Sequence, residues 1–243
     1  MTAKLFQSAC RTDCGRVRTV NQDAFFARDD AGLWAVSDGM GGHAWGEIAS
    51  AEIVNQLKIL VGSTSCAPSK AGVERALLNA NLSLQERSAA NRLRLGMGAT
   101  AAALCAGGGH YFCLWVGDSR IYRLRNKELT LLTHDHRYVQ ELVDSGALAA
   151  EAARIHPRRN VLTRAVGLER ELRIDTYDGT LARDDKFLIT TDGVTGVCSD
   201  DEIVACLRCP DIEDAADRLV ALCNMKGSPD NLALVLVQSL GEN

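Results

Sequence analysis

Residues 97–133 contain the pattern that most restricts how this chain can fold. The segment MGATAAALCAGGGHYFCLWVGDSRIYRLRNKELTLLT is a series of short apolar runs joined by GGG and RNKE. Parallel strands need a crossover connection of about a dozen residues or more, and these turns are much shorter. The segment therefore predicts antiparallel strands joined by hairpins.

The other apolar patterns predict helices and further strands. Residues 47–61 and 69–93 have apolar side chains at helical spacing, and the Gly, Ser and Pro residues of GSTSCAPS separate them. After a mixed helical and basic segment at 138–165, KFLITTDG predicts a strand, EDAADRLVALCNM a helix and NLALVLVQSL a final buried strand. Hairpin-paired strands with helices in runs favour a layered α+β domain over a doubly wound parallel sheet. Because the chain has no repeat or linker, we predict one domain over residues 1–243.

Composition restricts the possible partners. The 31 acidic and 27 basic residues give a formal charge of −4, which argues against binding to the phosphate backbone of nucleic acid. No apolar run approaches the roughly 18 residues that a membrane span requires, and the N-terminus lacks the apolar region of a secretory signal. We therefore expect a cytoplasmic protein that binds neither nucleic acid nor membrane.

The nine cysteines follow no disulfide or metal framework. Their number is odd, and a chain of this length does not need disulfides to fold, so we expect reduced thiols. Cys206 and Cys209 form the one pair with redox or zinc spacing. No second pair lies nearby, and we interpret these two as structural.

Five aspartates stand where apolar strand patterns begin or end. Asp38, Asp118 and Asp192 follow such runs, Asp230 comes just before the last run, and Asp23 opens another. A single aspartate at such a place is typical of a turn. If the strands lie side by side, however, several carboxylates converge at one edge, where they raise one another's pKa unless cations neutralise them.

A cluster of carboxylates, carbonyls and water is a hard-oxygen site, which selects magnesium, manganese or calcium over zinc. Two such ions a few ångströms apart can hydrolyse phosphate esters without a protein nucleophile. The glycines after Asp38 would let backbone carbonyls approach a metal closely. An arginine should then hold the phosphate, and we expect this to be Arg18, five residues before Asp23 on the same predicted strand.

Eight motifs follow one another along the chain: GRVRTVNQDAF, WAVSDGMGGHAWGEIAS, MGAT, VGDSRIYRL, LTHDH, HPRRNVLTRAVG, ITTDGVTG and SPDNLALVLV. In order and spacing they resemble those of the bacterial metal-dependent protein serine/threonine phosphatases, the protein phosphatase 2C type. The resemblance covers residues 10–238, and eight motifs in one order are far more specific than any single motif. It implies a four-layer αββα sandwich, two antiparallel β-sheets flanked by helix pairs, with a dinuclear manganese or magnesium centre at one end.

The resemblance also implies a role for each candidate metal ligand. Asp38 would bridge the two ions, and Gly39 would offer its carbonyl. Asp192 and Asp230 would complete the coordination of one ion, and Asp23 would bind a metal directly or through water. These five positions are the metal site that the resemblance predicts.

Three further expectations come from the same resemblance. Asp118 matches a carboxylate that helps to hold a third, weaker ion in bacterial members. Arg18 would take the substrate's phosphate, and together with Asp38 and Asp192 it would be catalytic. Residues 145–165 match a flap beside the site, where members differ and to which substrate choice is attributed.

The chain departs from the family pattern at three positions. Gln22 stands where certain relatives have a metal-binding glutamate, so water would fill that coordination position. Ala99 replaces a common threonine, which we interpret as a packing change. Met40 follows the first DG where other members have a histidine that has been proposed as general acid. The nearest histidine is His43, which either caps a loop or donates a proton, and the proton donor stays unassigned.

Two other phosphatase signatures fail on chemistry. CRTDCGR, Cys10 to Arg16, has the spacing of the cysteine phosphatases, but Asp13 would lie inside a loop that must bind a dianion. DTYDGTL, Asp175 to Leu181, imitates the aspartyl-phosphate motif but has threonine at the nucleophile position. We interpret it as a strand that ends in a turn.

We therefore expect a stand-alone, monomeric phosphoprotein phosphatase that hydrolyses phosphoserine and phosphothreonine and opposes a serine/threonine kinase. Its partners would be phosphorylated proteins, and its cofactors two Mn²⁺ or Mg²⁺ ions with room for a third, weaker one. Because the chain ends directly after the last strand, we expect no kinase, sensor or membrane module in it. The alternatives are a catalytically silent phosphate-reading or scaffold domain of the same fold and a hydrolase of small phosphate esters.

Overall fold

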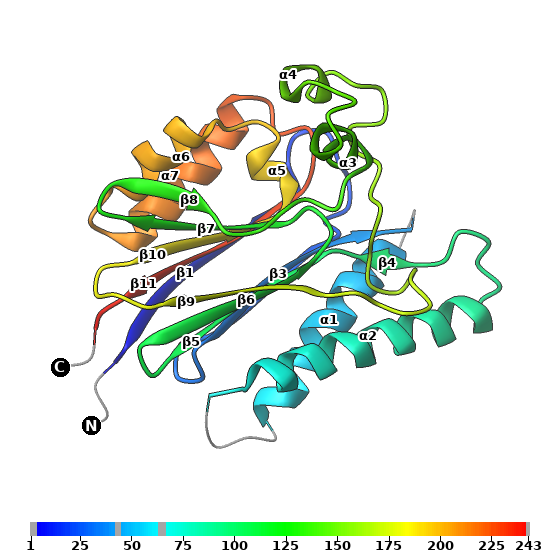
Figure 1. Ribbon diagram of the computed structural model, residues 1–243, viewed down its shortest axis with the longest axis horizontal. Helices are drawn as coiled ribbons and strands as arrows, with labels where there is room; N and C mark the ends of the chain where they lie inside the picture. Colours follow the sequence, from blue (N-terminus) through cyan, green and yellow to red (C-terminus); the bar gives the residue numbers. More distant parts are fainter. Residues whose placement is uncertain (1–3, 42–44, 63–66, 242–243) are drawn as a thin grey trace.

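Two β-sheets lie face to face at the centre of the structure, a computed structural model that describes residues 4–41, 45–62 and 67–241 (Figure 1). The paired strands in both sheets run antiparallel, as the sequence predicts. The first sheet has the order β2 (Asp23–Arg28), β3 (Leu33–Met40), β5 (Ala101–Gly107), β6 (His110–Val116) and β9 (Asp175–Thr180), and β4 (Gly98–Ala99) pairs with β3. The second has the order β1 (Phe6–Asp13), β11 (Leu232–Ser239), β10 (Lys186–Thr190), β7 (Arg120–Arg125) and β8 (Glu128–Leu131).

The two turns within residues 97–133 are tight hairpin turns. Gly108–Gly109 joins β5 to β6, and Asn126–Lys127 joins β7 to β8. All four residues have φ angles between 52° and 75°. Two successive residues with positive φ form the turn whose twist matches that of antiparallel strands. GGG and RNKE are therefore hairpin connections, as predicted.

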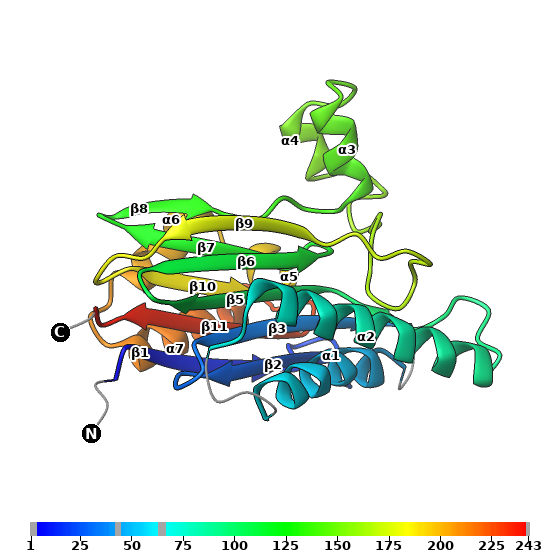
Figure 2. The same ribbon diagram turned by 60° about the horizontal axis from the view of Figure 1, so that its bottom comes forward.

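Helices cover the outer face of each sheet (Figures 1 and 2). Ser69 and Asp211 cap two of these helices by accepting hydrogen bonds from backbone N–H groups of the first turn. The predicted helices are present, although the second ends at Ala90 and not at residue 93. On the first sheet lie α1 (Trp45–Gly62) and α2 (Lys70–Ala90), and on the second lie α5 (Asp192–Thr195), α6 (Asp200–Leu207) and α7 (Ile212–Met225).

Three apolar layers hold this architecture together. Trp34 and Phe187 are fully buried between the two sheets. A second layer, which includes Leu57, separates the first sheet from its helices, and a third, which includes Leu219, does so for the second sheet. Each such side chain stabilises the fold by about 1.5–3 kcal/mol when it is fully buried. The molecule is the predicted four-layer αββα sandwich, and none of its helices within the described ranges is long and apolar enough to cross a membrane.

Residues 138–165 leave the sandwich at one end. Figure 2 shows their two helices projecting beyond the sheets. At the base of the projection, Tyr138 N–H donates to the carbonyl of Val161 and Thr163 N–H to that of His136, both at 2.9 Å. The predicted flap, 145–165, falls within this segment, whose helices are α3 (Tyr138–Asp144) and α4 (Ala150–Ala153).

The chain passes from the first sheet to the second at this same end of the sandwich. Gly117, Asp118 and Ser119 connect β6 to β7. Gly117 has a φ of 101°, and a Cβ there would overlap Thr100, so the crossing requires glycine. Asp118 is thereby held at the junction of the two sheets.

Candidate metal centre

The five aspartates converge at the end of the sandwich where the chain crosses between sheets. Asp23, the first residue of β2, lies opposite Asp38 of β3 in the strand register. Asp192 follows β10 as the first residue of α5, and Asp230 lies just before β11. Together with Asp118 at the crossing, they bring carboxylates from both sheets to one place.

Their proximity is visible in the electrostatics of Asp38. Removal from water raises the pKa of Asp38 well above its usual value, and the negative charges of Asp23, Asp192, Asp118 and Asp230 raise it further. All four therefore lie close enough to repel the Asp38 carboxylate.

Asp23 has an unsatisfied oxygen inside the cluster. Its Oδ2 accepts a hydrogen bond from Thr191 Oγ1 at 2.7 Å, which lowers its pKa, and the neighbouring Asp38 carboxyl also lowers it. Oδ1 is buried and has no hydrogen-bond donor among the described residues. Burial raises the pKa of Asp23 by more than the Thr191 hydrogen bond lowers it, and the charges of Asp192 and Asp230 add to the rise. A buried carboxylate oxygen without a donor is costly unless a cation approaches it.

Two arginines neutralise other members of the cluster. Arg18 Nη2 donates to Asp230 Oδ2 at 2.8 Å. Arg137 Nε donates to Asp118 Oδ2 at 2.6 Å, and its Nη2 donates to Asp192 Oδ2 at 3.1 Å. Burial, followed by the charge of Asp118, still raises the pKa of Asp192, while Arg137 lowers it. The cluster thus has more carboxylates than cations.

Arg18 is not on the strand that the sequence predicts for it. β1 ends at Asp13 and β2 begins at Asp23, so Arg18 lies in the loop between them. Asn231 holds this loop: its Nδ2 donates to the carbonyls of Cys14 and Val20 at 2.9 Å each. The prediction that Arg18 lies on the strand of Asp23 is therefore wrong, but the loop still brings Arg18 into contact with Asp230.

Gly39 is required by the close approach of three backbone segments. Its N–H donates to the carbonyl of Gln22 at 3.2 Å. A Cβ at Gly39 would overlap the carbonyl oxygens of Gly46 and Gln22. Any side chain would therefore separate the end of β3 from α1 and from the residue that precedes Asp23.

Sequence reasoning missed several residues that position the aspartates. Thr100 Oγ1 accepts a hydrogen bond from Asp38 N–H at 2.9 Å and lies 2.6 Å from Ser119 Oγ, which fixes the end of β3 against the β6–β7 crossing. Asn231 clamps the Arg18 loop, and Arg137 bridges two carboxylates. Thr100, Ser119 and Asn231 lie within the motifs MGAT, VGDS and SPDN, respectively. Their membership of these motifs was the sequence signal that could have identified them.

The three departures from the family pattern lie within the described residues, whereas His43 does not. Ala99 is fully buried and exchanges backbone hydrogen bonds with Val166 at 2.9 Å, which agrees with its interpretation as a packing residue. Met40 ends β3. Gln22 N–H donates to Asn231 Oδ1. The suggested role of His43 falls outside the described residues.

The donor set fits divalent cations that prefer oxygen ligands, although the side chains are not yet arranged as a chelate. Across residues 4–41, 45–62 and 67–241, no three Asp, Glu, His or Cys side chains are gathered closely enough to hold one ion. Asp118, Asp192 and Asp230 are instead turned to the two arginines. Among the described residues, the unsatisfied Asp23 Oδ1 and a cluster built from carboxylates together fit Mg²⁺ or Mn²⁺.

The rejected signatures have no catalytic geometry. Burial, followed by the charge of Asp29, raises the pKa of Cys10 to about 11, so its thiol stays protonated. Cys206 and Cys209 are buried free thiols. Asp175 opens β9, which pairs along its length with β6, as expected of a strand.

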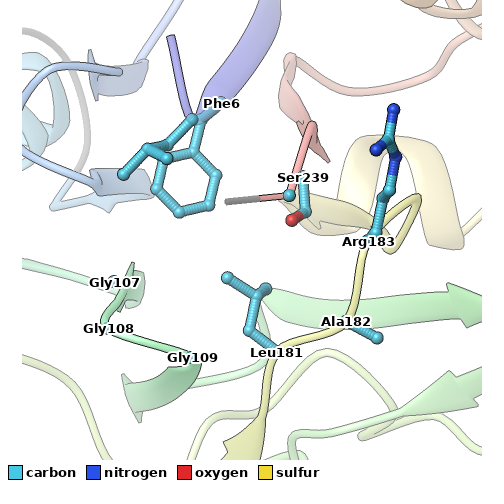
Figure 3. Close-up of a pocket in the computed structure, with 10 residues that line it drawn as sticks. Phe6, Gly107, Gly108, Gly109, Leu181, Ala182, Arg183 and Ser239 are labelled. Atoms are coloured by element: carbon cyan, nitrogen blue, oxygen red, sulfur yellow. The ribbon is translucent and has the colours of Figure 1, made fainter. Parts of the chain in front are cut away.

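A cavity of about 220 Å³ lies at the opposite end of the sandwich. Figure 3 shows it between Phe6, the glycines of the β5–β6 turn and Leu181 to Arg183. Phe6 begins β1, whereas the aspartates gather where β1 ends. The cavity therefore plays no part in the acidic cluster.

Comparisons with known proteins agree with this fold and this site. The family model Protein phosphatase 2C matches residues 12–236. The serine/threonine protein phosphatase PstP of Mycobacterium tuberculosis is 35% identical over 229 residues, which are 94% of this chain but 44% of that protein. The serine/threonine phosphatase stp of Listeria monocytogenes is 32% identical over 236 residues, 94% of each chain.

Solved structures match over nearly the whole chain. The crystal structure of the M. tuberculosis phosphatase PstP/Ppp has a TM-score of 0.91 at 33% identity and covers 98% of this chain and 100% of that one. The catalytic domain of PstP in complex with two manganese ions has a TM-score of 0.89 at 32% identity, over 98% of this chain and 99% of that one. The acidic end of the sandwich, the family model and these relatives agree, and the chain belongs to the protein phosphatase 2C family of metal-dependent serine/threonine phosphatases.

Proposed function

We propose that this chain hydrolyses phosphoserine and phosphothreonine in proteins, with two Mn²⁺ or Mg²⁺ ions held at the acidic end of the sandwich. The observation that carries the proposal is the convergence of five aspartates from both sheets, one with a buried oxygen to which no described residue donates a hydrogen bond. The family and the two manganese ions bound by a solved relative support it.

In this proposal each ligand has a separate task. Asp38 would contribute to holding both ions, and Gly39 would offer its carbonyl. Asp192 and Asp230 would hold one ion, and Asp23 would act directly or through water. When bound, the two ions supply an activated water and offset the charge that develops on the phosphoryl oxygens.

Arg18 is the residue that we assign to the substrate's phosphate. Its side chain is about half exposed (54%), and it reaches the edge of the cluster at Asp230. A guanidinium can bind two phosphate oxygens at once. Arg18 would therefore orient the phosphoryl group beside Asp230 after it exchanges the Asp230 contact for the substrate.

The projecting segment supports a protein substrate. Arg158 and Arg159 are exposed on it, together with Ile155, which is 82% exposed. Basic and apolar side chains on a segment that begins next to Arg137, a residue in contact with the acidic cluster, suit a phosphopeptide with acidic and apolar neighbours. We propose that residues 145–165 form a flap that selects substrates, and that these are targets of a serine/threonine kinase, or the kinase itself.

The cellular setting is part of the proposal. The chain spans 44% of the length of the M. tuberculosis relative that it matches. The activity that we assign to this chain is therefore a proposal, and it does not include what the rest of that relative does. The eight described cysteines are free thiols, as suits a reducing compartment such as the cytoplasm. We propose that the chain acts there as a monomer.

Phosphate release from a phosphothreonine peptide tests the function. The protein is stripped with EDTA and assayed with Mn²⁺, with Mg²⁺ or with buffer alone, beside p-nitrophenyl phosphate as a small ester. Peptide hydrolysis that requires either ion is expected, and Cys10→Ser should match the unsubstituted chain. Hydrolysis of the ester alone would favour the small-ester hydrolase. Phosphopeptide binding without turnover under any condition would favour the phosphate-reading domain.

A further inference from the structure

Arg137 places a permanent positive charge inside the acidic cluster. Its Nε donates to Asp118 at 2.6 Å, its Nη2 donates to Asp192 at 3.1 Å, and Nε lies 3.8 Å from Asp135. The side chain is 18% exposed. One guanidinium thus bridges a carboxylate of the β6–β7 crossing and a carboxylate at the end of β10.

The backbone of Arg137 is fixed, so the guanidinium has a defined position. Arg137 precedes α3 with extended dihedral angles and pairs with Leu162 in an isolated β-bridge. The preceding residue, His136, donates its N–H to the carbonyl of Gly117 and accepts from Gly117 N–H through Nδ1, at 2.9 and 3.0 Å. These bonds tie the Arg137 segment to the residue next to Asp118.

A divalent ion and this guanidinium would compete for the same oxygens. Oxygen ligands lie about 2.0–2.6 Å from Mg²⁺ or Ca²⁺, so an ion shared by Asp118 and Asp192 needs the position that the N–H donors of Arg137 occupy. Each carboxylate has a second oxygen, and Arg137 donates only to Oδ2 of Asp192, so it does not hold the other oxygen of that residue. Arg137 therefore blocks one ion position without removing Asp192 from another.

We propose that Arg137 replaces a further divalent ion between Asp118 and Asp192, so that this chain binds two ions and not three. The inference rests on the proposed function, because it takes the assigned ligands as given. Unlike an ion, the guanidinium does not exchange with solution, and its charge at Asp118 is independent of metal supply. The third, weaker ion that the family resemblance suggests is then absent from this chain.

Counting bound manganese tests the inference without relying on activity. The unsubstituted chain, Arg137→Met and Arg11→Met are dialysed to equilibrium against millimolar Mn²⁺, and metal per chain is measured by elemental analysis. Arg11 is the matched control, because it also bridges two carboxylates, Glu213 and Asp217, and contacts none of the proposed ligands. We expect two ions in the unsubstituted chain and in Arg11→Met, and three in Arg137→Met.

A second substitution assigns the additional ion to its position. Asp118→Asn in the Arg137→Met background should return the count from three to two. The count is repeated with Arg137→Ser, and thermal unfolding identifies which variants are folded. Three ions in the unsubstituted chain, or two in both folded Arg137 variants, would overturn this inference and leave the proposed function intact. No bound manganese in the unsubstituted chain would overturn both.

Discussion

Two aspartates at opposite ends of the sandwich show what distinguishes a structural carboxylate from one that is available to a metal. Asp185, at the end with the tight hairpins, has a fully buried side chain that accepts two hydrogen bonds from Arg125 at 2.6 Å each and one from Ala182 N–H. Asp38 forms no ion pair with any described residue and is surrounded by four other carboxylates. Where the chain supplies its own cation the charge is satisfied, and where it does not, a cation must come from solution.

The same contrast separates the two arginines of the cluster. Arg137 is mostly buried and bridges two carboxylates, whereas Arg18 is about half exposed and contacts one. A buried bridge fixes charge in place, and an exposed single contact can be exchanged for a ligand. The position of a guanidinium thus indicates whether it maintains the site or serves the substrate.

The largest expected effect is on turnover. Asp38→Ala or Asp192→Ala should lower kcat by about 1000-fold or more, because each removes ligand charge from ions that supply several kcal/mol of transition-state stabilisation. The proteins should stay folded, since each substitution removes a repelled carboxylate. Phosphopeptide kinetics with circular dichroism will measure both. A folded Asp38→Ala protein with full activity would contradict the assignment of Asp38 as a metal ligand.

Asp185→Asn should have the opposite profile. Breaking a buried ion pair leaves the remaining charge uncompensated and costs about 3–5 kcal/mol of unfolding free energy. Metal-dependent activity at low temperature should be close to normal, because Asp185 lies at the other end of the sandwich. Urea unfolding together with phosphopeptide kinetics will test this. If the Asp185→Asn protein had normal stability but no turnover, Asp185 would not be a structural carboxylate, and the contrast with Asp38 would be wrong.

The metal-free protein should lose stability as pH rises. Asp23, Asp38 and Asp192 all have pKa values raised by folding, so the folded state retains protons that the unfolded state releases above about pH 4. Stability therefore falls from about pH 4 upward through the raised pKa values. Thermal unfolding in EDTA will follow this slope, which Mn²⁺ and the Asp38→Asn substitution should each reduce. If the stability in EDTA did not change with pH, the pKa values of these aspartates would not be raised by folding.

Arg18→Ala should have the smallest effect. Loss of a charge-assisted hydrogen bond to phosphate, roughly 1.5–3 kcal/mol, should raise KM by about 10-fold or more while kcat changes little, as expected when ground and transition states are bound alike. Initial rates over a range of phosphopeptide concentrations will separate the two constants. An unchanged KM would assign Arg18 to the Asp230 contact alone.

The sequence was sufficient to predict the fold and to single out the five aspartates that the structure brings to one end of it, for reasons that particular residues make clear. The short turns at Gly108–Gly109 and Asn126–Lys127 exclude parallel strands, and an aspartate next to an apolar run must lie at a strand end. Arg18, by contrast, was assigned to the wrong element, because no apolar alternation marks where β1 ends. Its position depends on contacts with Asn231, more than 200 residues away in the chain.

Arg137 could not be predicted for a related reason. It stands directly before the mixed helical and basic segment 138–165, and a single arginine at such a place is usually solvated. Its partners, Asp118 and Asp192, are positioned by different sheets. Only the packing of the two sheets together brings these three residues into contact.

The convergence of carboxylates from both sheets has a further consequence. Because Asp38 belongs to the first sheet and Asp192 and Asp230 flank strands of the second, ions held by these three residues would link the two sheets. Binding that is selective for the folded state adds to its stability in proportion to the logarithm of the free ion concentration. A cell short of manganese or magnesium would then have a phosphatase that is both idle and more readily degraded, so that metal supply would set its abundance as well as its rate.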